Sequence, residues 1–142
     1  YTSEPLTRAV DVAGWVNPVL FVSSDAKDTD FAVKLVDVAP DGTAYIIGDT
    51  ILRARYRDGM AREVMMKPGQ TYRLEPTPMT TGARFAAGHR IRVEITSSDF
   101  PKFVRNLNTG GDNVSETRAV IARNAIHHAP GEVSFIEFSV LP

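Results

Sequence analysis

Few residue types in this 142-residue chain could carry out chemistry, and serine is the first to consider. A serine hydrolase of the α/β type places its nucleophile in a Gly-x-Ser-x-Gly elbow, because small neighbours permit the sharp strand-to-helix turn. None of the eight serines here has a glycine two positions before it. The chain also has no Cys, which excludes disulfides, thiolate metal sites and thiol catalysis. We therefore predict that this chain contains no catalytic residue.

Two groups of residues could bind a metal ion, but neither has a suitable spacing. His127 and His128 are adjacent, so on a strand they would point to opposite faces, whereas zinc ligands are usually two or more residues apart. Asp25, Asp28 and Asp30 form an oxygen-rich cluster, but the glycine and final glutamate of a calcium-binding loop are absent. We expect loop histidines, aspartates that cap turns, and no metal or cofactor.

Arginine outnumbers lysine twelve to four, and Arg53, Arg55 and Arg57 alternate along one segment. A planar guanidinium suits phosphate binding. However, the 16 cationic and 17 acidic residues leave a formal net charge of −1, so no global field favours nucleic acid or an anionic membrane. We expect a solvated face on which these arginines pair with carboxylates of neighbouring strands.

The segment SSDFPKFVRNLNTGG (97–111) mixes aromatic, cationic and amide side chains, as binding loops do. Its aromatic rings can bury apolar surface, its amides can bond backbone groups, and Gly110 and Gly111 permit a turn with positive φ. Trp15 is the only indole, which suits an interface or a sugar-binding platform. The segment is therefore a docking seam, an internally packed loop or a ligand site. The residues that we assign to docking or to holding the loop are Trp15, Phe100, Phe103, Arg105, Asn106 and Asn108.

The elements that must position these residues are strands, because alternation of apolar and polar residues recurs along the chain. In residues 31–38, Phe31, Val33 and Leu35 share one face. The same pattern predicts strands over 51–57 and 89–96, and weaker signals predict them over 8–13, 18–23, 43–47, 62–66, 70–75, 117–123 and 132–140. Turn signals lie at 39–42, 57–59, 67–69, 86–88 and 129–131. No amphipathic helical pattern is present, so we predict an all-β chain forming an antiparallel β-sandwich, specifically a jelly roll.

The length suits one domain, residues 1–142, with a single core. No apolar run approaches the ~20 residues that a membrane-spanning helix needs. The chain opens at Tyr1 and reaches regular structure almost at once, so we expect it to be a piece of a longer protein.

Several stretches together resemble a known family. They are VSSDAKDTDFAVKLVDVAPDG (22–42), ILRARYRDG (51–59), AGHRIRVEITSSDFPKFVRNLNTGG (87–111) and IHHAPGEVSFIEFSVLP (126–142). In this order they are similar to the C-terminal domain of CocE/NonD hydrolases, which include cocaine esterase-like and α-amino acid ester hydrolase-like proteins and are related to X-Pro dipeptidyl-peptidases. Asp99 and Val104 stand where Asn and Asp would be more usual.

The resemblance implies a galactose-binding-like jelly roll that follows an α/β-hydrolase domain in the same chain. In the family the Ser-Asp-His triad and oxyanion hole belong to the hydrolase part, so no catalytic residue is carried over to this chain. The implied function is a non-catalytic accessory domain of an acyl esterase or dipeptidyl-peptidase, with its hydrolase domain as the partner and a homodimer through an exposed apolar patch as a further contact. The alternative is an autonomous module that binds a small ligand or a carbohydrate.

Overall fold

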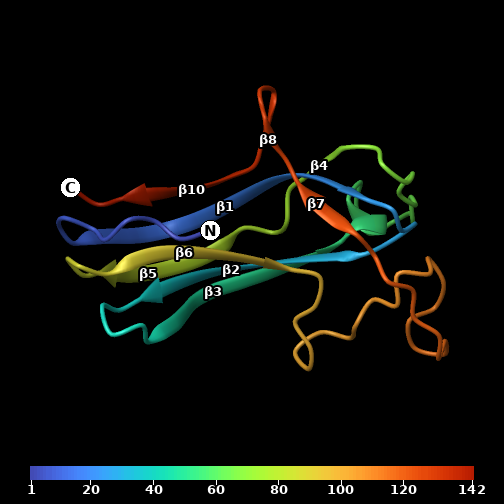
Figure 1. The fold of residues 1–142 in the computed structure, drawn as a ribbon, viewed down its shortest axis with the longest axis horizontal. Helices are drawn as coiled ribbons and strands as arrows, with labels where there is room; N and C mark the ends of the chain where they lie inside the picture. Colours follow the sequence, from blue (N-terminus) through green and yellow to red (C-terminus); the bar gives the residue numbers. More distant parts are fainter.

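The computed structural model describes residues 1–142, which form a sandwich of antiparallel sheets (Figure 1). The first sheet is built around one long central strand, β1 (Val10–Ser24). Its first part pairs with β10 (Phe135–Val140) and β5 (Met79–Phe85), and its last part pairs with β4 (Tyr72–Leu74) and β7 (Asn124–Ile126). Pairing with β5 ends at Val16 and pairing with β4 begins at Leu20. Between them lies Pro18, which has no N–H to donate to a ladder.

The second sheet has the strand order β3-β2-β6, with β3 at Ala44–Arg53, β2 at Asp30–Val38 and β6 at Arg90–Thr96. A bulge shifts the β2–β3 register between Leu35 and Val36. A short hairpin, β8 (His128–Ala129) and β9 (Glu132–Val133), projects from the sandwich (Figure 1). One turn of 3-10 helix, η1 (Ala54–Tyr56), follows β3 directly. No helix of the structure has the length and hydropathy needed to cross a bilayer.

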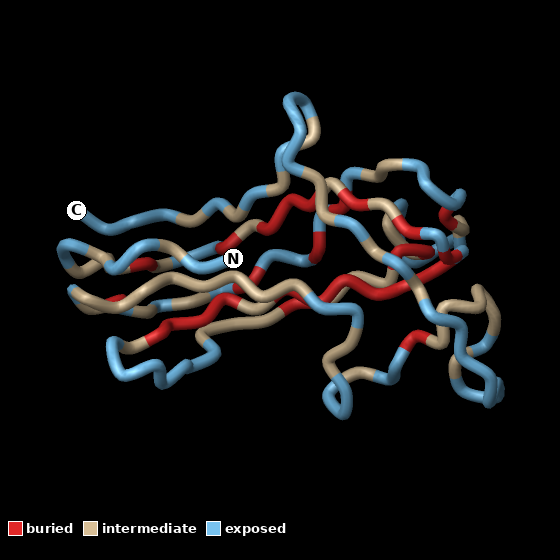
Figure 2. Tube along the Cα trace, viewed as in Figure 1, coloured by how far each residue is buried: buried red, intermediate tan, exposed pale blue.

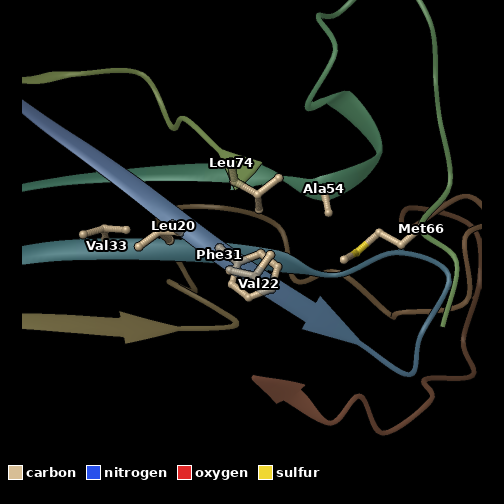
Figure 3. Close-up of a cluster of buried hydrophobic side chains, with 7 residues drawn as sticks. All are labelled: Leu20, Val22, Phe31, Val33, Ala54, Met66 and Leu74. Atoms are coloured by element: carbon tan, nitrogen blue, oxygen red, sulfur yellow. The ribbon is translucent and has the colours of Figure 1, made fainter. Parts of the chain in front are cut away.

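The core lies between the two sheets, where the inward-facing residues of their strands meet (Figure 2). Phe31, Val33 and Leu35 all lie there, as their alternation predicts. One cluster consists of Leu20, Val22, Phe31, Val33, Ala54, Met66 and Leu74 (Figure 3). A second cluster contains Val12, Val16, Leu35, Met79 and Phe85. The predicted all-β antiparallel sandwich is confirmed, while its jelly-roll wiring and galactose-binding-like class stay predictions.

Several strand boundaries differ from the prediction. The segments 8–13 and 18–23 belong to one strand, β1, and 43–47 joins the first residues of 51–57 in β3. The predicted strands at 62–66 and 117–123 are wrong, because neither segment pairs in a ladder, and β5 was missed. By contrast, the glycine in each of the five predicted turns has positive φ: Gly42, Gly59, Gly69, Gly88 and Gly131.

Candidate docking surface

Residues 97–123 form a long loop that follows β6 and is held against the β3-β2-β6 sheet. Lys34 in β2 pairs with Asp99 at 2.6 Å, and Lys102 pairs with Asp49 in β3 at 2.5 Å. Asp99, which stands where Asn would be more usual, therefore forms an ion pair with Lys34. Figure 2 shows the loop mostly exposed, with buried backbone at one short point. That buried residue is Asn106.

Asn106 connects the loop to a buried network of charges. Its Nδ2 donates to Asp28 Oδ2 at 2.6 Å and to Asp30 Oδ1 at 2.8 Å. Its Oδ1 accepts a hydrogen bond from the backbone N–H of Asn108 at 2.9 Å. Since one amide bonds two carboxylates and its own loop, Asn106 fixes where residues 104–108 cross the edge of the sheet.

Two arginines neutralise the same carboxylates. Arg55 Nε donates to Asp28 Oδ2 at 2.7 Å, and the Arg55 backbone N–H donates to Asp28 Oδ1 at 2.9 Å. Arg53 grips Asp30 with Nε and Nη2, at 2.9 and 3.1 Å. Each arginine also donates to a loop carbonyl, Arg53 to Val104 and Arg55 to Gly111. The charges are thus paired, which burial requires, and the two arginines hold the loop at Val104 and at Gly111.

The electrostatics of Arg55 follow from this arrangement. Burial by itself would lower the pKa of Arg55, but the hydrogen bonds and negative charges of Asp28 and Glu63 together outweigh it, so the pKa is raised. At the exposed side of the charge network, Tyr56 Oη donates a hydrogen bond to Glu63 Oε1 at 2.7 Å. That bond, followed by the charge of Arg55, lowers the pKa of Glu63.

The predicted cross-strand pairing of arginine with carboxylate is confirmed by Arg53 and Asp30, which face each other across β3 and β2. Two other predictions about charged residues are wrong. Arg55 does not lie on a solvated strand face, because β3 ends at Arg53 and η1 turns the Arg55 side chain inward onto Asp28. Asp28 and Asp30 do not cap turns but are almost fully buried partners of arginine. Asp25 does have a turn-like role, since its Oδ1 accepts the backbone N–H of Arg123.

The histidines are separated as predicted. His127 Nε2 lies 2.9 Å from Ser23 Oγ, whereas exposed His128 lies 3.0 Å from the hydroxyl of Tyr1. No group of three or more His, Cys, Asp or Glu side chains in the structure is arranged to hold a metal ion. Asn124 Oδ1 is the single buried side-chain polar atom without a hydrogen bond.

The aromatic residues assigned to docking fall on two separate surfaces. Trp15 is 62% exposed on β1 and borders a shallow hollow with residues of β10. Phe100 is 67% exposed in the loop, where the Arg105 guanidinium lies 5.7 Å from its ring centre. Phe103 is half-buried beside β3 and lies under the ammonium of Lys102. The structure thus does not bring Trp15 together with the two phenylalanines.

The remaining assigned residues hold the loop. Asn108 Nδ2 donates to the Val120 carbonyl at 2.8 Å, and Asn108 itself has φ of +62°. Gly110 has the predicted positive φ, but Gly111 does not.

Sequence reasoning missed a set of exposed apolar side chains around the loop, which we call the loop face: Met60, Phe100, Val104, Val114 and Ile121. Met60 and Val104 line a groove of about 310 Å³ beside Phe103 and Tyr56. Val104 and Val114 line a neighbouring, more polar hollow over Arg53 and Arg55. No sequence pattern predicts such a set, because its members are far apart along the chain and Met60 meets Val104 only in the folded structure.

Comparison with known proteins places this fold in a family. The model for the X-Pro dipeptidyl-peptidase C-terminal non-catalytic domain matches residues 1–137, and the chain belongs to this family. The chain is 43% identical to the cocaine esterase of Rhodococcus sp. (strain MB1 Bresler) over 99% of its own length and 25% of that protein's. It is also 35% identical, over 72% of its length, to a putative serine esterase of Mycobacterium bovis.

Solved structures agree with this assignment. An aminopeptidase from a marine sediment Thaumarchaeota archaeon superposes with a TM-score of 0.94 at 27% identity, covering 100% of this chain and 25% of that one. An α-amino acid ester hydrolase gives a TM-score of 0.93, also at 27% identity, covering 99% of this chain and 25% of the hydrolase. The chain is thus a non-catalytic C-terminal domain of the kind found in CocE/NonD and X-Pro dipeptidyl-peptidase hydrolases. It spans about a quarter of the length of these relatives.

Proposed function

We propose that the chain is the accessory domain of a serine hydrolase, of the acyl esterase or X-Pro dipeptidyl-peptidase type, and that it docks on an α/β-hydrolase domain through the loop face. Supporting this, the matched relatives are about four times longer, and the matching family is described as non-catalytic. In such a protein the hydrolase domain performs acyl transfer through a serine nucleophile, and this domain stabilises it and borders its active-site entrance.

The observation that carries the proposal is an apolar surface on a rigidly held loop. Met60 is 79%, Val114 84% and Ile121 88% exposed. Val104 lines one hollow with Met60 and a second with Val114, so these apolar side chains share a surface, as they do at interaction sites. The loop that carries Val114 and Ile121 is fixed by the Asp28, Asp30 and Asn106 contacts, and Met60 lies beside it in the segment that follows η1. A surface that is both apolar and preorganised loses little entropy when it binds a partner domain.

The alternative, a carbohydrate-binding module, is less well supported. A sugar site needs unpaired polar groups next to an aromatic ring, to bond the hydroxyls while the ring stacks on the sugar. Here the amide of Asn106 is buried and fully used, and the arginines of the neighbouring hollow are paired with carboxylates. The polar chemistry around the loop therefore serves the loop itself.

The first experiment is to read the coding sequence upstream of Tyr1, which should encode a Gly-x-Ser-x-Gly elbow.

In the whole protein, the double variant Phe100→Ser/Ile121→Ser should weaken docking, exposing the junction to limited proteolysis and lowering the thermal stability of the hydrolase domain. The matched control is Trp15→Ser, because Trp15 is a similarly exposed aromatic residue on the other sheet. This variant should change neither the proteolysis of the junction nor the thermal stability. Equal effects of the two variants, or an effect of Trp15→Ser alone, would contradict docking through the loop face. A rise in KM for bulky esters in the double variant would support the entrance role.

A further inference from the structure

The sandwich is open along one side, between β6 of one sheet and β10 of the other. The opening leads into a cavity of about 220 Å³, lined mainly by apolar residues. Its lining includes Leu20 and Val33, which belong to the hydrophobic core (Figure 3). Its walls are Val93, Ile95, Phe135 and Ile136. An apolar cavity of ~150 Å³ already accommodates a benzene ring, so this one has room for a large side chain.

The polar groups at the cavity mouth already have partners. The Tyr1 hydroxyl is 3.0 Å from His128 Nε2. Ser134 Oγ accepts from the Phe21 N–H at 2.9 Å and donates to the His127 carbonyl at 2.9 Å. No side-chain donor or acceptor at the mouth is free to bond a polar occupant, so the side chain that suits this cavity is apolar.

The edge of β6 shows from which direction such a group can come. The Tyr1 amino group donates to the Val93 carbonyl at 2.9 Å, and the Val93 N–H donates to the Tyr1 carbonyl at 2.8 Å. Thr2 then pairs with Arg92, and the Ser3 N–H donates to the Ile91 carbonyl. Residues 1–3 therefore form an antiparallel ladder along β6, and Tyr1 lies beside the middle of that strand (Figure 1).

β6 continues beyond this ladder to Thr96. Alternate residues of a strand point their N–H and C=O groups to the same side. Since those of Val93 point to Tyr1, those of Ile95 point to the same edge, opposite β2, and no strand pairs with them there. The unpaired edge at Ile95 lies directly at the cavity, because Ile95 is one of its lining residues.

We propose that the residues preceding Tyr1 in the whole protein extend this ladder along β6 and cover the cavity. Residues opposite each other in an antiparallel pair project to the same face. Tyr1 lies opposite Val93 and lines the cavity with it, so the residue two positions before Tyr1 lies opposite Ile95 and projects into the cavity. This residue is apolar, and its side chain completes the core. The inference rests on the proposed function only in that residues precede Tyr1.

Hydrogen exchange on the whole protein tests the ladder. The Ile95 amide should exchange at least ~100-fold more slowly than a free amide, because it donates to the preceding segment. In the whole protein, replacing the residue two positions before Tyr1 by Asp should abolish this protection and lower the melting temperature. The matched control is an Asp at the residue one position before Tyr1, which projects to the opposite face. This variant should leave both the protection of the Ile95 amide and the melting temperature unchanged.

The inference would be overturned by an unprotected Ile95 amide, by equal effects of the two Asp variants, or by a charged residue found naturally two positions before Tyr1. Protection that increases with protein concentration would also overturn it, because a second copy would then be the occupant. The outcome is separate from the docking test. A protected Ile95 amide with an intact junction in Phe100→Ser/Ile121→Ser would leave this inference standing and refute the loop-face docking.

Discussion

At the scale of single residues, the side-chain amide of Asn106 makes three hydrogen bonds that hold the loop on the sandwich. One amide bonds Asp28, Asp30 and the Asn108 N–H, so it connects the start of β2 to a loop that is distant from it in sequence. Without Asn106, Asp28 and Asp30 would stay buried and desolvated but would each lack one of the hydrogen bonds that compensate for the loss of water. The donors of Arg53 and Arg55 that reach this cluster are already bonded to Asp28, Asp30 and loop carbonyls.

Asn106→Ala should therefore destabilise the chain by about 1–3 kcal/mol. For a domain of this size the melting temperature falls by several degrees, which thermal unfolding measures. The control is Asn17→Ala, since Asn17 makes no side-chain hydrogen bond, and its melting curve should shift little. An unshifted curve for Asn106→Ala would show that the amide does not hold the loop.

Glu63 provides a test by pH. Its pKa is lowered, first by the hydrogen bond from Tyr56 and then by Arg55. A carboxyl whose pKa is lower in the folded state contributes stability above its unfolded pKa, and this is lost as the pH falls through the folded pKa. Tyr56→Phe should raise the pKa of Glu63 towards its ordinary value, as a carboxyl NMR titration would show. Asp112, whose pKa is lowered by Ser115 and the Val114 N–H, should titrate unchanged.

At the scale of elements, the end of β3 determines the loop. The strand stops at Arg53 because η1 begins at Ala54, and this turn directs Arg55 onto Asp28 beneath the loop. The loop then needs a backbone conformation at Gly110 that few side chains tolerate. Its φ is +80°, and an added Cβ would lie 3.3 Å from Met65 Sδ and 3.4 Å from Lys27 Cβ.

Gly110→Ala should cost about 1–3 kcal/mol, because it combines left-handed strain with crowding. Gly82→Ala in β5 is the control, since Gly82 has ordinary φ and an added Cβ would meet no atom within 4 Å. Chemical denaturation of both variants gives the comparison. Equal stability of the two would mean that the loop relaxes at Gly110 without cost.

At the scale of the whole molecule, the chain belongs to a family of non-catalytic C-terminal domains. No serine lies in an elbow sequence, and the matching family is described as non-catalytic. The chain alone should therefore hydrolyse neither p-nitrophenyl esters nor X-Pro amides above the uncatalysed rate. Turnover that a serine-directed inhibitor abolishes would contradict this.

The fold class followed from the sequence because its signal is local. Alternation places Phe31, Val33 and Leu35 on one face, and glycines such as Gly42 and Gly131 mark the turns. The resemblance of 87–111 to a family run likewise pointed to the C-terminal domain that the comparisons show. Strand lengths were less predictable, because β1 continues through Gly14 and Pro18, residues that ordinarily interrupt a strand.

The site depended on long-range contacts that no local pattern contains. Arg55 and Asp28 are 27 residues apart, and Asn106 is 78 residues from Asp28. The alternation of Arg53, Arg55 and Arg57 suggested a solvated stripe, but tertiary packing favoured burying Arg55 once Asp28 could neutralise it. Periodicity and turn residues thus determined that the chain is an antiparallel β-sandwich, and the family run pointed to its place among non-catalytic C-terminal domains. Only the tertiary structure decided which charges are buried and which apolar side chains face outward, because burial depends on partners that the fold brings together.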